Sequence, residues 1–252
     1  MGLRYRSVQM TPSAEGERFH RASLSARESA GGGLTRITVD PGQRVASTYK
    51  SPGQYIEIRV SGESGYFVLA NEPGAAAWHL IMRRGGGVSD VLLAIAPGAS
   101  LEVTDAIGSG FPMDASRGRR LVIALGGTGV AAALPLVHRR MADGDATRTD
   151  VLIGLRSRNE VPIHAALDAW ASAGVRVIAC TSQDESATVA GTGEVRYARG
   201  YVQDALRLLA AESHNSLAGA LVFAVGPDSM IDSLRELAPE LGIRREDVLT
   251  NH

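Results

Sequence analysis

Residues 121–134 read LVIALGGTGVAAAL and carry the clearest structural pattern in the chain. An apolar run enters a glycine-rich turn, and a pattern typical of an α-helix follows. Glycines at such a turn let the backbone approach a ligand, and the helix N-terminus offers N–H groups and a partial positive charge to a phosphate. Gly127, Thr128 and Gly129 are therefore predicted to bind a dinucleotide. Tight packing of the strand on the helix is the alternative reason for the glycines, and the spacing matches neither GxGxxG nor a Walker lysine loop.

The strand, loop and helix order repeats downstream of this turn. Strands are predicted over 121–125, 151–155, 175–181, 220–225 and 248–249, and helices over 131–141, 163–173, 203–211 and 228–241. Near-continuous apolar strands that alternate with amphipathic helices are typical of a parallel sheet covered on both faces. The sequence predicts a Rossmann-like α/β domain with five strands over residues 116–252.

A second glycine turn follows the predicted strand 220–225. It contains Gly226, Pro227, Asp228 and Met230 at the start of a predicted helix. Ligands of open parallel sheets lie beyond the carboxyl ends of the strands, so this turn and the first one are expected to share one ligand. The alternative is that Pro227 and Asp228 are ordinary helix-starting residues.

Upstream of a polar boundary at residues 114–118, the apolar runs are short and separated by Pro-Gly pairs. These runs cover residues 34–39, 55–60, 66–69, 79–82 and 101–103. The pattern predicts an antiparallel β-barrel over residues 19–115, after an N-terminal extension at 1–18. One helix is expected in this half, over 89–95. The loop RGGGVSD at 84–90 opens that helix and is either a second phosphate-binding loop or a flexible connection.

Composition narrows the possible functions. The 252 residues include 26 Lys+Arg and 27 Asp+Glu, so there is no electrostatic reason to expect nucleic acid or an anionic membrane surface as the main partner. No apolar run is long enough to insert in a membrane, and residues 1–18 lack a signal-peptide core, which favours a cytoplasmic protein over the alternative of a transit peptide. The histidines form no metal-binding pair, no GxSxG motif occurs, and the lone Cys180 is predicted to be a buried, inert thiol.

Several motifs occur in a specific order. They are PGQY at 52–55, GYFVLAN at 65–71, GGGVS at 85–89, IGSGF at 107–111, GGTG at 126–129 and VGPDSM at 225–230. From about residue 20 to the end, the chain closely resembles the ferredoxin-NADP reductase family. The resemblance implies that the barrel binds FAD, that the α/β domain binds NAD(P)H, and that electrons pass to a separate acceptor. SQ at 182–183, GYVQ at 200–203 and the closing LTNH resemble a short, stand-alone branch without an iron–sulfur domain.

The resemblance also implies which residues contact the flavin. The family motif Arg-x-Tyr-Ser/Thr falls on Gly65, Phe67 and Val68, so the aromatic face is kept while the phosphate-binding arginine and the hydroxyl are lost. Arg83 or Arg84 is the expected replacement for that arginine. The implied flavin contacts are Phe67, Val68, Leu69, Ala70, Asn71, Met82, Arg83, Gly86, Gly87, Val88 and Ser89.

The nicotinamide side departs from the family as well. Val225 stands where a cysteine often lies near the nicotinamide, and His252 stands where the chain end commonly places an aromatic residue over the flavin. Val68, Val225 and His252 are therefore the residues expected around the hydride-transfer point.

Ser182 and Gln183 fall where the family binds the adenosine ribose. The acids Asp184 and Glu185 beside them favour NADH over NADPH. Arg156 or Arg158, after the second predicted strand, is the alternative ligand for a 2′-phosphate.

The resemblance and the residues together predict a flavoprotein that oxidises NAD(P)H on FAD and reduces an external protein or small molecule. The rival interpretation is a reductase-fold protein that has lost FAD and acts as a nucleotide sensor or a non-catalytic assembly subunit. The changed flavin motif supports the rival, whereas Phe67, the GGGVS loop and the complete nucleotide-side turns support the enzyme.

Overall fold

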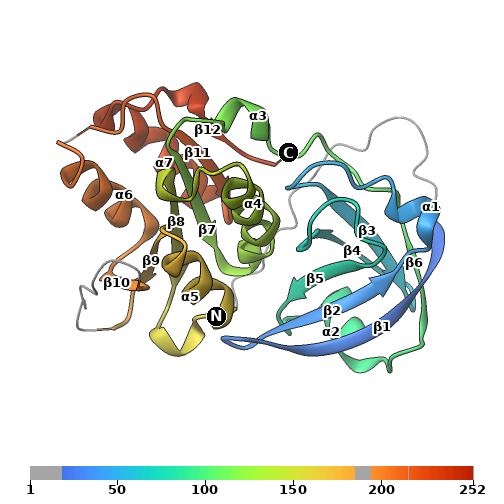
Figure 1. The fold of residues 1–252 in the computed structure, drawn as a ribbon. Coiled ribbons are helices and arrows are strands. Elements are labelled where there is room, and N and C mark those ends of the chain that lie inside the picture. Colours follow the sequence, from blue (N-terminus) through green and yellow to red (C-terminus); the bar gives the residue numbers. More distant parts are fainter. Residues whose placement is uncertain (1–18, 185–193, 215, 252) are drawn as a thin grey trace.

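The computed structural model describes residues 19–184, 194–214 and 216–251. Two six-stranded sheets lie side by side, one antiparallel and one parallel (Figure 1). The predicted combination of an antiparallel barrel and a parallel α/β domain is therefore confirmed.

The N-terminal half is a barrel-like antiparallel sheet. Its strands are β1 (His20–Gly31), β2 (Leu34–Asp40), β3 (Tyr55–Val60), β4 (Glu63–Val68), β5 (Trp78–Met82) and β6 (Ser100–Val103), in the order β4-β3-β6-β1-β2-β5. The edge strands β4 and β5 approach each other, because the Ala70 N–H just after β4 donates to the carbonyl of His79 in β5 at 2.8 Å. Alternate residues such as Ile56, Ile58 and Leu80 face inward and form the core.

Two helices accompany the barrel. The predicted helix is α2 (Gly87–Ala94), which buries Val88 and Leu92 against the barrel core. A second short helix, α1 (Gln43–Ala46), corrects the expectation of only one. It follows Pro41-Gly42 and buries Val45. Because it is a single helical turn directly after a Pro-Gly pair, the sequence pattern there indicated only a turn.

The α/β half contains six parallel strands, not the five expected. They are β7 (Leu121–Gly126), β8 (Thr149–Leu155), β9 (Arg176–Thr181), β10 (Arg196–Arg199), β11 (Leu221–Val225) and β12 (Val248–Leu249), in the order β10-β9-β8-β7-β11-β12. The additional strand, β10, is a half-exposed edge strand with the sequence RYAR. Its short sequence contains no apolar run, and none of its side chains is fully buried. Arg196 holds its start through an ion pair with Glu212 at 2.7 Å.

Helices cover both faces of the parallel sheet. The helices are α4 (Val130–Ala142), α5 (His164–Ser172), α6 (Val202–Ala211) and α7 (Asp228–Leu237). Along β7, Ile123 packs in the layer with α4 and α5, and Val122 packs in the layer with α6 and α7. The last predicted helix is shorter than expected, because α7 gives way to a 3-10 helix, Ala238–Leu241, that contains Pro239.

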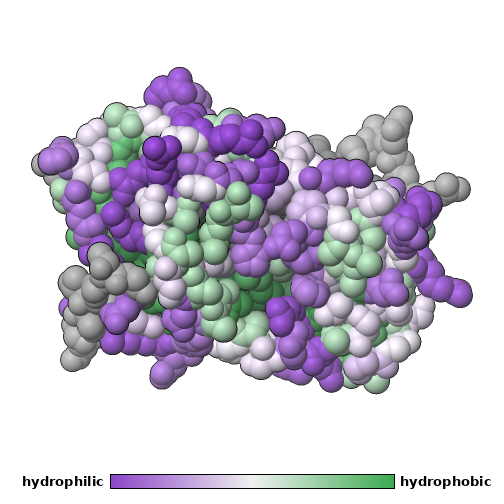
Figure 2. Space-filling view, in the orientation of Figure 1, coloured by the Kyte–Doolittle hydropathy of each residue, from purple (hydrophilic) through white to green (hydrophobic). Residues whose placement is uncertain are grey.

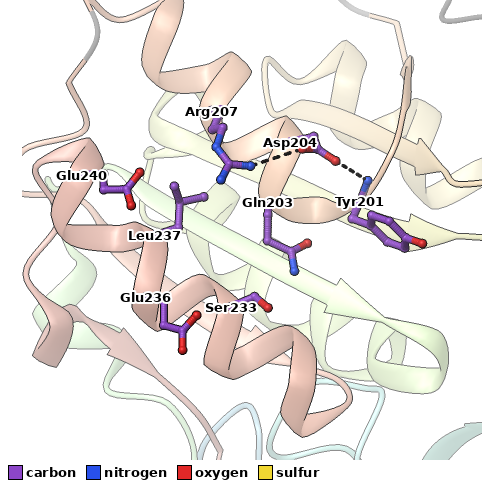
Figure 3. Close-up of a pocket in the computed structure, with 8 residues that line it drawn as sticks. All are labelled: Tyr201, Gln203, Asp204, Arg207, Ser233, Glu236, Leu237 and Glu240. Atoms are coloured by element: carbon purple, nitrogen blue, oxygen red, sulfur yellow. Dashed lines mark hydrogen bonds and ion pairs between the residues drawn. The ribbon is translucent and has the colours of Figure 1, made fainter.

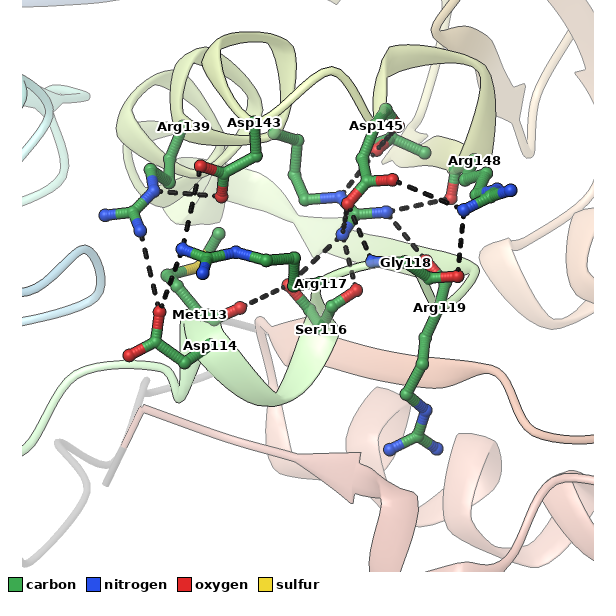
Figure 4. Close-up of polar contacts among 12 residues, drawn as sticks. Met113, Asp114, Ser116, Arg117, Gly118, Arg119, Arg139, Asp143, Asp145 and Arg148 are labelled. Carbon is green, nitrogen blue, oxygen red and sulfur yellow. Dashed lines mark hydrogen bonds and ion pairs between the residues drawn. The ribbon is translucent and has the colours of Figure 1, made fainter.

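The polar boundary between the halves is not a loose linker, because hydrogen bonds and ion pairs hold it against the α/β half. It contains the short helix α3 (Met113–Ser116), which lies beside the C-terminal end of α4 (Figure 4). The fully buried Arg140 of α4 donates to the carbonyls of Ser116 at 2.5 Å and Arg119 at 2.7 Å, and it pairs with Asp145 at 3.0 Å. Residues 116–119 are therefore fastened to the α/β half.

Apolar side chains join the two halves. Phe111, from the end of the barrel half, stacks on Phe223 of β11 with ring centroids 4.5 Å apart. Ile81 of β5 belongs to the same buried cluster as Val130 and Ala131 at the start of α4. In the space-filling view, hydrophobic surface is visible in the central part of the molecule (Figure 2).

Polar backbone contacts add to this interface. The tip of the β1–β2 hairpin docks on the loop before α5, where the N–H of Ile163 donates to the carbonyl of Ala30 at 2.6 Å. At the other end of the chain, the side chain of Asn251 donates to the carbonyl of Gly53 at 3.2 Å. These two contacts connect the barrel to the α/β half at the loop before α5 and at Asn251.

Candidate functional site at the carboxyl edge of the parallel sheet

The strand order places the two predicted glycine turns together. From β7 the chain adds β8, β9 and β10 on one side, whereas β11 and β12 lie on the other side. The switch point is therefore between β7 and β11, which is where open α/β sheets bind their ligands. Gly126 at the end of β7 and Gly226 after β11 meet there: a Cβ on Gly226 would lie 3.1 Å from the nitrogen of Gly126.

The glycines of the first turn have two different roles. A Cβ on Gly129 would lie 2.4 Å from the carbonyl oxygen of Val225, and one on Gly126 would lie 2.9 Å from Cδ of Pro227. These two positions need glycine for packing, as the alternative interpretation proposed. Gly127 differs, because it has φ +59° and no atom within 4 Å of an added Cβ. Gly127 and Thr128 are exposed at the N-terminus of α4, so their backbone is open to a ligand.

The second turn lies at the start of α7, next to the first turn. Pro227 and Asp228 are exposed and begin α7. The half-buried Met230 reaches across the turn, and its Sδ lies 3.0 Å from the position that a Cβ on Gly126 would take. The predicted residues of both turns therefore lie side by side at the carboxyl edge of the sheet.

The predicted adenosine residues lie further along the same edge. The N–H groups of Ser182 and Gln183 donate to the carbonyls of Leu155 and Arg156 at 3.2 and 2.9 Å, so they continue β9 beside β8. The guanidinium of Arg156 pairs with Glu160 at 2.8 Å.

The other predicted arginine also has an acidic partner. The N–H of Arg158 donates to the carboxylate of Asp184 at 2.9 Å, and its side chain lies 4.0 Å from the same oxygen. Arg156 and Arg158, the two candidate ligands for a 2′-phosphate, thus each already contact a carboxylate. Glu185 lies outside the described residues.

A cavity of about 370 Å³ lies between α6 and α7 (Figure 3). Its lining combines an exposed aromatic ring, an amide and several charges: Tyr201, Gln203, Asp204, Arg207, Ser233, Glu236, Leu237 and Glu240. Tyr201 is 65% exposed, and Oε1 of Gln203 is buried without a hydrogen-bond partner among the described residues. Tyr201 is not among the predicted site residues, although it belongs to the GYVQ motif at 200–203, just before the predicted helix 203–211.

The position of the missing flavin arginine is closed. Gly65 and Phe67 of β4 face Ile58 and Ile56 of β3, on the side of the sheet covered by α2. A Cβ on Gly65 would lie 2.5 Å from Cγ1 of Val88. Phe67 is half-buried against the barrel core and keeps part of its ring accessible. The aromatic side chain expected beside a flavin ring is therefore present and half-buried, whereas the arginine is absent.

In the predicted phosphate-binding loop of the barrel, the backbone N–H groups are already hydrogen-bonded to a side-chain carboxylate. The N–H groups of Gly85 and Gly86 donate to the two carboxylate oxygens of Asp90, at 3.1 and 3.0 Å. Arg83 and Arg84, at the end of β5, make no hydrogen bond or ion pair with any residue that the structure describes. The ring side of the site fits a flavin. The phosphate side does not fit a pyrophosphate as the loop stands.

Other predicted flavin residues have structural partners. Leu69 and Met82 lie in the barrel core, and Ala70 lies in the cluster between the two halves. The side chain of Asn71 holds its own loop, because its Oδ1 accepts the N–H of His79 at 2.7 Å and its Nδ2 donates to the carbonyl of Ala77 at 3.2 Å. The half-buried Ser89 follows Val88 in the first turn of α2.

The residues expected at the hydride-transfer point are brought together in part. Val68 at the end of β4 packs against the apolar cluster that contains Val225 of β11. His252 lies outside the described residues.

Other expectations concern reactive groups and membranes. Cys180 is fully buried in β9, as predicted, and burial raises the pKa of its thiol to about 12, which disfavours the reactive thiolate. Within residues 19–184, 194–214 and 216–251, no group of three or more His, Cys, Asp or Glu side chains is placed to hold a metal ion. In the same part of the chain, no helix has the length and apolarity needed to cross a membrane.

Known proteins resemble this chain in sequence and in fold. The oxidoreductase NAD-binding domain family matches residues 123–236. The ferredoxin–NAD(+) reductase component of the alkene monooxygenase system of Xanthobacter autotrophicus is 25% identical over 195 residues, which are 70% of this chain and 58% of that protein. The ferredoxin–NAD(P)(+) reductase component of the naphthalene 1,2-dioxygenase/salicylate 5-hydroxylase systems of a Ralstonia species is 27% identical over 201 residues, 77% of this chain and 57% of that protein.

A solved structure extends the comparison to the whole fold. The ferredoxin NADP+ reductase of Neisseria gonorrhoeae, with bound FAD and NADP, superposes with a TM-score of 0.70 at 14% identity, over 89% of this chain and 92% of that one. This chain spans less than two thirds of the length of the two oxygenase-system reductases. Residues 123–236 thus match the oxidoreductase NAD-binding domain family, and the fold of the chain is similar to that of a ferredoxin NADP+ reductase.

Proposed function

We propose that this chain is an NAD(P)H-dependent flavin oxidoreductase that transfers electrons from a nicotinamide nucleotide, through a flavin, to a separate acceptor. The open turn at Gly127 and Thr128, at the switch point between β7 and β11, supports this proposal most directly. A positive φ and free space let the backbone N–H groups face a phosphate at the N-terminus of α4.

The adenosine half of the nucleotide is proposed to bind beside the carboxyl end of β9. Ser182 and Gln183 continue β9, and the N–H of Gly200 donates to the carbonyl of Thr181 at 3.0 Å, which sets the exposed Tyr201 beside them. An exposed aromatic ring offers a stacking face to a base. The adenosine half is therefore assigned to this side and the nicotinamide half to the crevice beside Gly226.

The described residues expected near the hydride-transfer point, Val68 and Val225, are apolar and carry no proton donor. Val68 and Val225 supply apolar packing in the same cluster at the interface between the halves. A flavin bound beside Phe67 would supply the hydride acceptance and the one-electron release. The chain itself supplies orientation, so the proposal requires no acid–base pair.

NADH is the preferred nucleotide in this proposal. Arg156 pairs with Glu160, and Arg158 contacts Asp184, so a 2′-phosphate would have to break existing ion pairs. The cavity next to Tyr201 adds Glu236 and Glu240. Carboxylates repel a 2′-phosphate, whereas a free 2′-hydroxyl can donate a hydrogen bond to them.

The acceptor is proposed to be a separate protein or small molecule. The two curated relatives described above are reductase components of oxygenase systems. Cys180 is the single cysteine among these 252 residues and is buried, so it cannot ligate an iron–sulfur cluster by itself. A cluster that receives the electrons would therefore be held outside these residues.

The test combines nucleotide binding with electron transfer. We expect calorimetric titration to show NADH binding to the purified chain, and we expect added FAD to support NADH-driven reduction of an artificial acceptor. Failure of NADH to bind would contradict the proposal. NADH binding without flavin binding or acceptor reduction would favour the second function.

That second function is a nucleotide sensor or assembly subunit that works without flavin. One observation favours it, namely the contact of Asp90 with the loop that should receive the flavin phosphates. The two functions share the nucleotide crevice and differ only at the barrel.

A further inference from the structure

We propose that Asp90 takes the place of a flavin phosphate in the barrel loop, so that this chain binds flavin through the ring and exchanges it readily. The inference rests on the proposed flavin function and concerns its selectivity among flavins. It assigns to Asp90 a specificity-determining role that the motif comparison does not indicate.

The contacts of Asp90 satisfy the loop. Its Oδ1 accepts the N–H of Gly85 at 3.1 Å and its Oδ2 accepts the N–H of Gly86 at 3.0 Å. A carboxylate that accepts two backbone N–H groups makes charge-assisted hydrogen bonds, which are stronger than neutral ones. A pyrophosphate that approached the same N–H groups would have to displace an anion that is already bound.

The surroundings add to this selectivity. Glu63 of β4 places Oε2 3.7 Å from the position of a Cβ on Gly87, so a second carboxylate faces the start of α2. Val88 fills the space beside Gly65, where the family has its phosphate-binding arginine. Like charges near the loop and the absence of that arginine both disfavour a phosphate.

The loop still has positive charge available if Asp90 is neutralised. Arg83 and Arg84 precede Gly85 directly, and neither has a hydrogen bond or an ion pair to another described residue. Removal of one negative charge would therefore leave two guanidinium groups and two backbone N–H groups for a phosphate.

This arrangement predicts how different flavins bind. Riboflavin has the isoalloxazine ring and a ribityl chain without phosphate, and FAD adds a pyrophosphate and an adenosine to them. With Asp90 in place the pyrophosphate contributes little, so FAD and riboflavin should bind the unmodified chain with dissociation constants within about threefold of each other. Phe67 supplies the contact that the two ligands share.

The experiment is a flavin fluorescence titration of the full chain with FAD and with riboflavin. The variants are Asp90→Asn, which keeps one acceptor oxygen for the loop, and Asp90→Ser, which keeps a shorter one. Asp168→Asn is the matched control, because Asp168 is an exposed acid on α5 and its substitution changes the net charge equally. Thermal unfolding verifies that each variant is folded.

We expect both Asp90 variants to bind FAD at least about tenfold more tightly, because a charge-assisted contact becomes available to phosphate, while riboflavin binding stays the same. Asp168→Asn should change neither. An unmodified chain that binds FAD more than about threefold more tightly than riboflavin would overturn the inference, and so would folded variants with unchanged FAD affinity.

The outcomes separate the inference from the proposed function. If both flavins bind, NADH reduces the acceptor and the Asp90 variants match the unmodified chain, the inference fails and the function stands. If the variants gain FAD affinity but no protein oxidises NADH, the inference stands and the function fails. If no flavin binds any of the proteins, both are wrong.

Discussion

Substitution of Gly127 by alanine separates ligand binding from packing in the first glycine turn. Gly127 has φ +59° and open space around an added Cβ, so Gly127→Ala creates no clash. The cost to folding is the left-handed backbone conformation, about 1–2 kcal/mol for a residue with a Cβ. The new methyl group would project into the space assigned to the nucleotide phosphates.

The expected effect on binding is larger than the effect on stability. Loss of one charge-assisted hydrogen bond to a phosphate removes about 1.5–3 kcal/mol, which weakens NADH binding roughly tenfold to hundredfold. Calorimetric titration with NADH measures the dissociation constant, and urea unfolding measures the free energy of unfolding.

Two other glycines serve as controls. Gly144 follows the other end of α4, has φ +78° and also has no atom within 4 Å, so Gly144→Ala should cost similar stability and leave NADH binding intact. Gly129→Ala should destabilise by up to about 3 kcal/mol, because its Cβ would lie 2.4 Å from the backbone oxygen of Val225, which cannot rotate away. If Gly127→Ala and Gly144→Ala bind NADH equally well, the turn does not hold the phosphates and the reasoning is refuted.

The remaining predictions concern the nucleotide, the hydride step and the boundary helix. Gln183→Arg should raise the ratio of kcat/KM for NADPH to that for NADH, since it adds a cation at the adenosine end; an unchanged ratio would place the 2′-position elsewhere. Val68→Ser and Val225→Cys should each accelerate flavin reduction by NADH in anaerobic stopped-flow, with non-additive effects because both act on one geometry, and rates that stay the same would contradict this. Arg140→Met should lower the free energy of unfolding by about 3–5 kcal/mol, because it leaves buried carbonyls and a buried carboxylate without their partner, and a loss under 1 kcal/mol would show that the network is dispensable.

The contrast between the two halves could be predicted from local patterns. Short apolar runs bounded by Pro-Gly turns predicted β2, β3 and β5, and longer apolar strands followed by helix patterns predicted β7 and α4. These patterns are local because each strand or helix must bury one face or both, which imposes a period on the sequence.

Two strands could not be predicted in this way. β1 buries only Ala22 and Leu24 in twelve residues, and β10 buries none of its side chains fully. Both owe their strand conformation to hydrogen bonds with neighbouring strands, β2 and β6 for β1 and β9 for β10. Backbone pairing of this kind leaves little trace in the order of apolar residues.

By itself, the sequence determined that two glycine turns follow two strands and begin two helices. The tertiary structure decided which glycines serve a ligand, because Gly129 is fixed by the carbonyl of Val225 while Gly127 faces open space. It also decided that Asp90 fills the loop at Gly86, an interaction that the glycine pattern alone does not reveal. A glycine or an aspartate looks the same in the sequence whether its turn packs against the protein or binds a ligand. What distinguishes the two is the set of atoms that folding brings within contact distance.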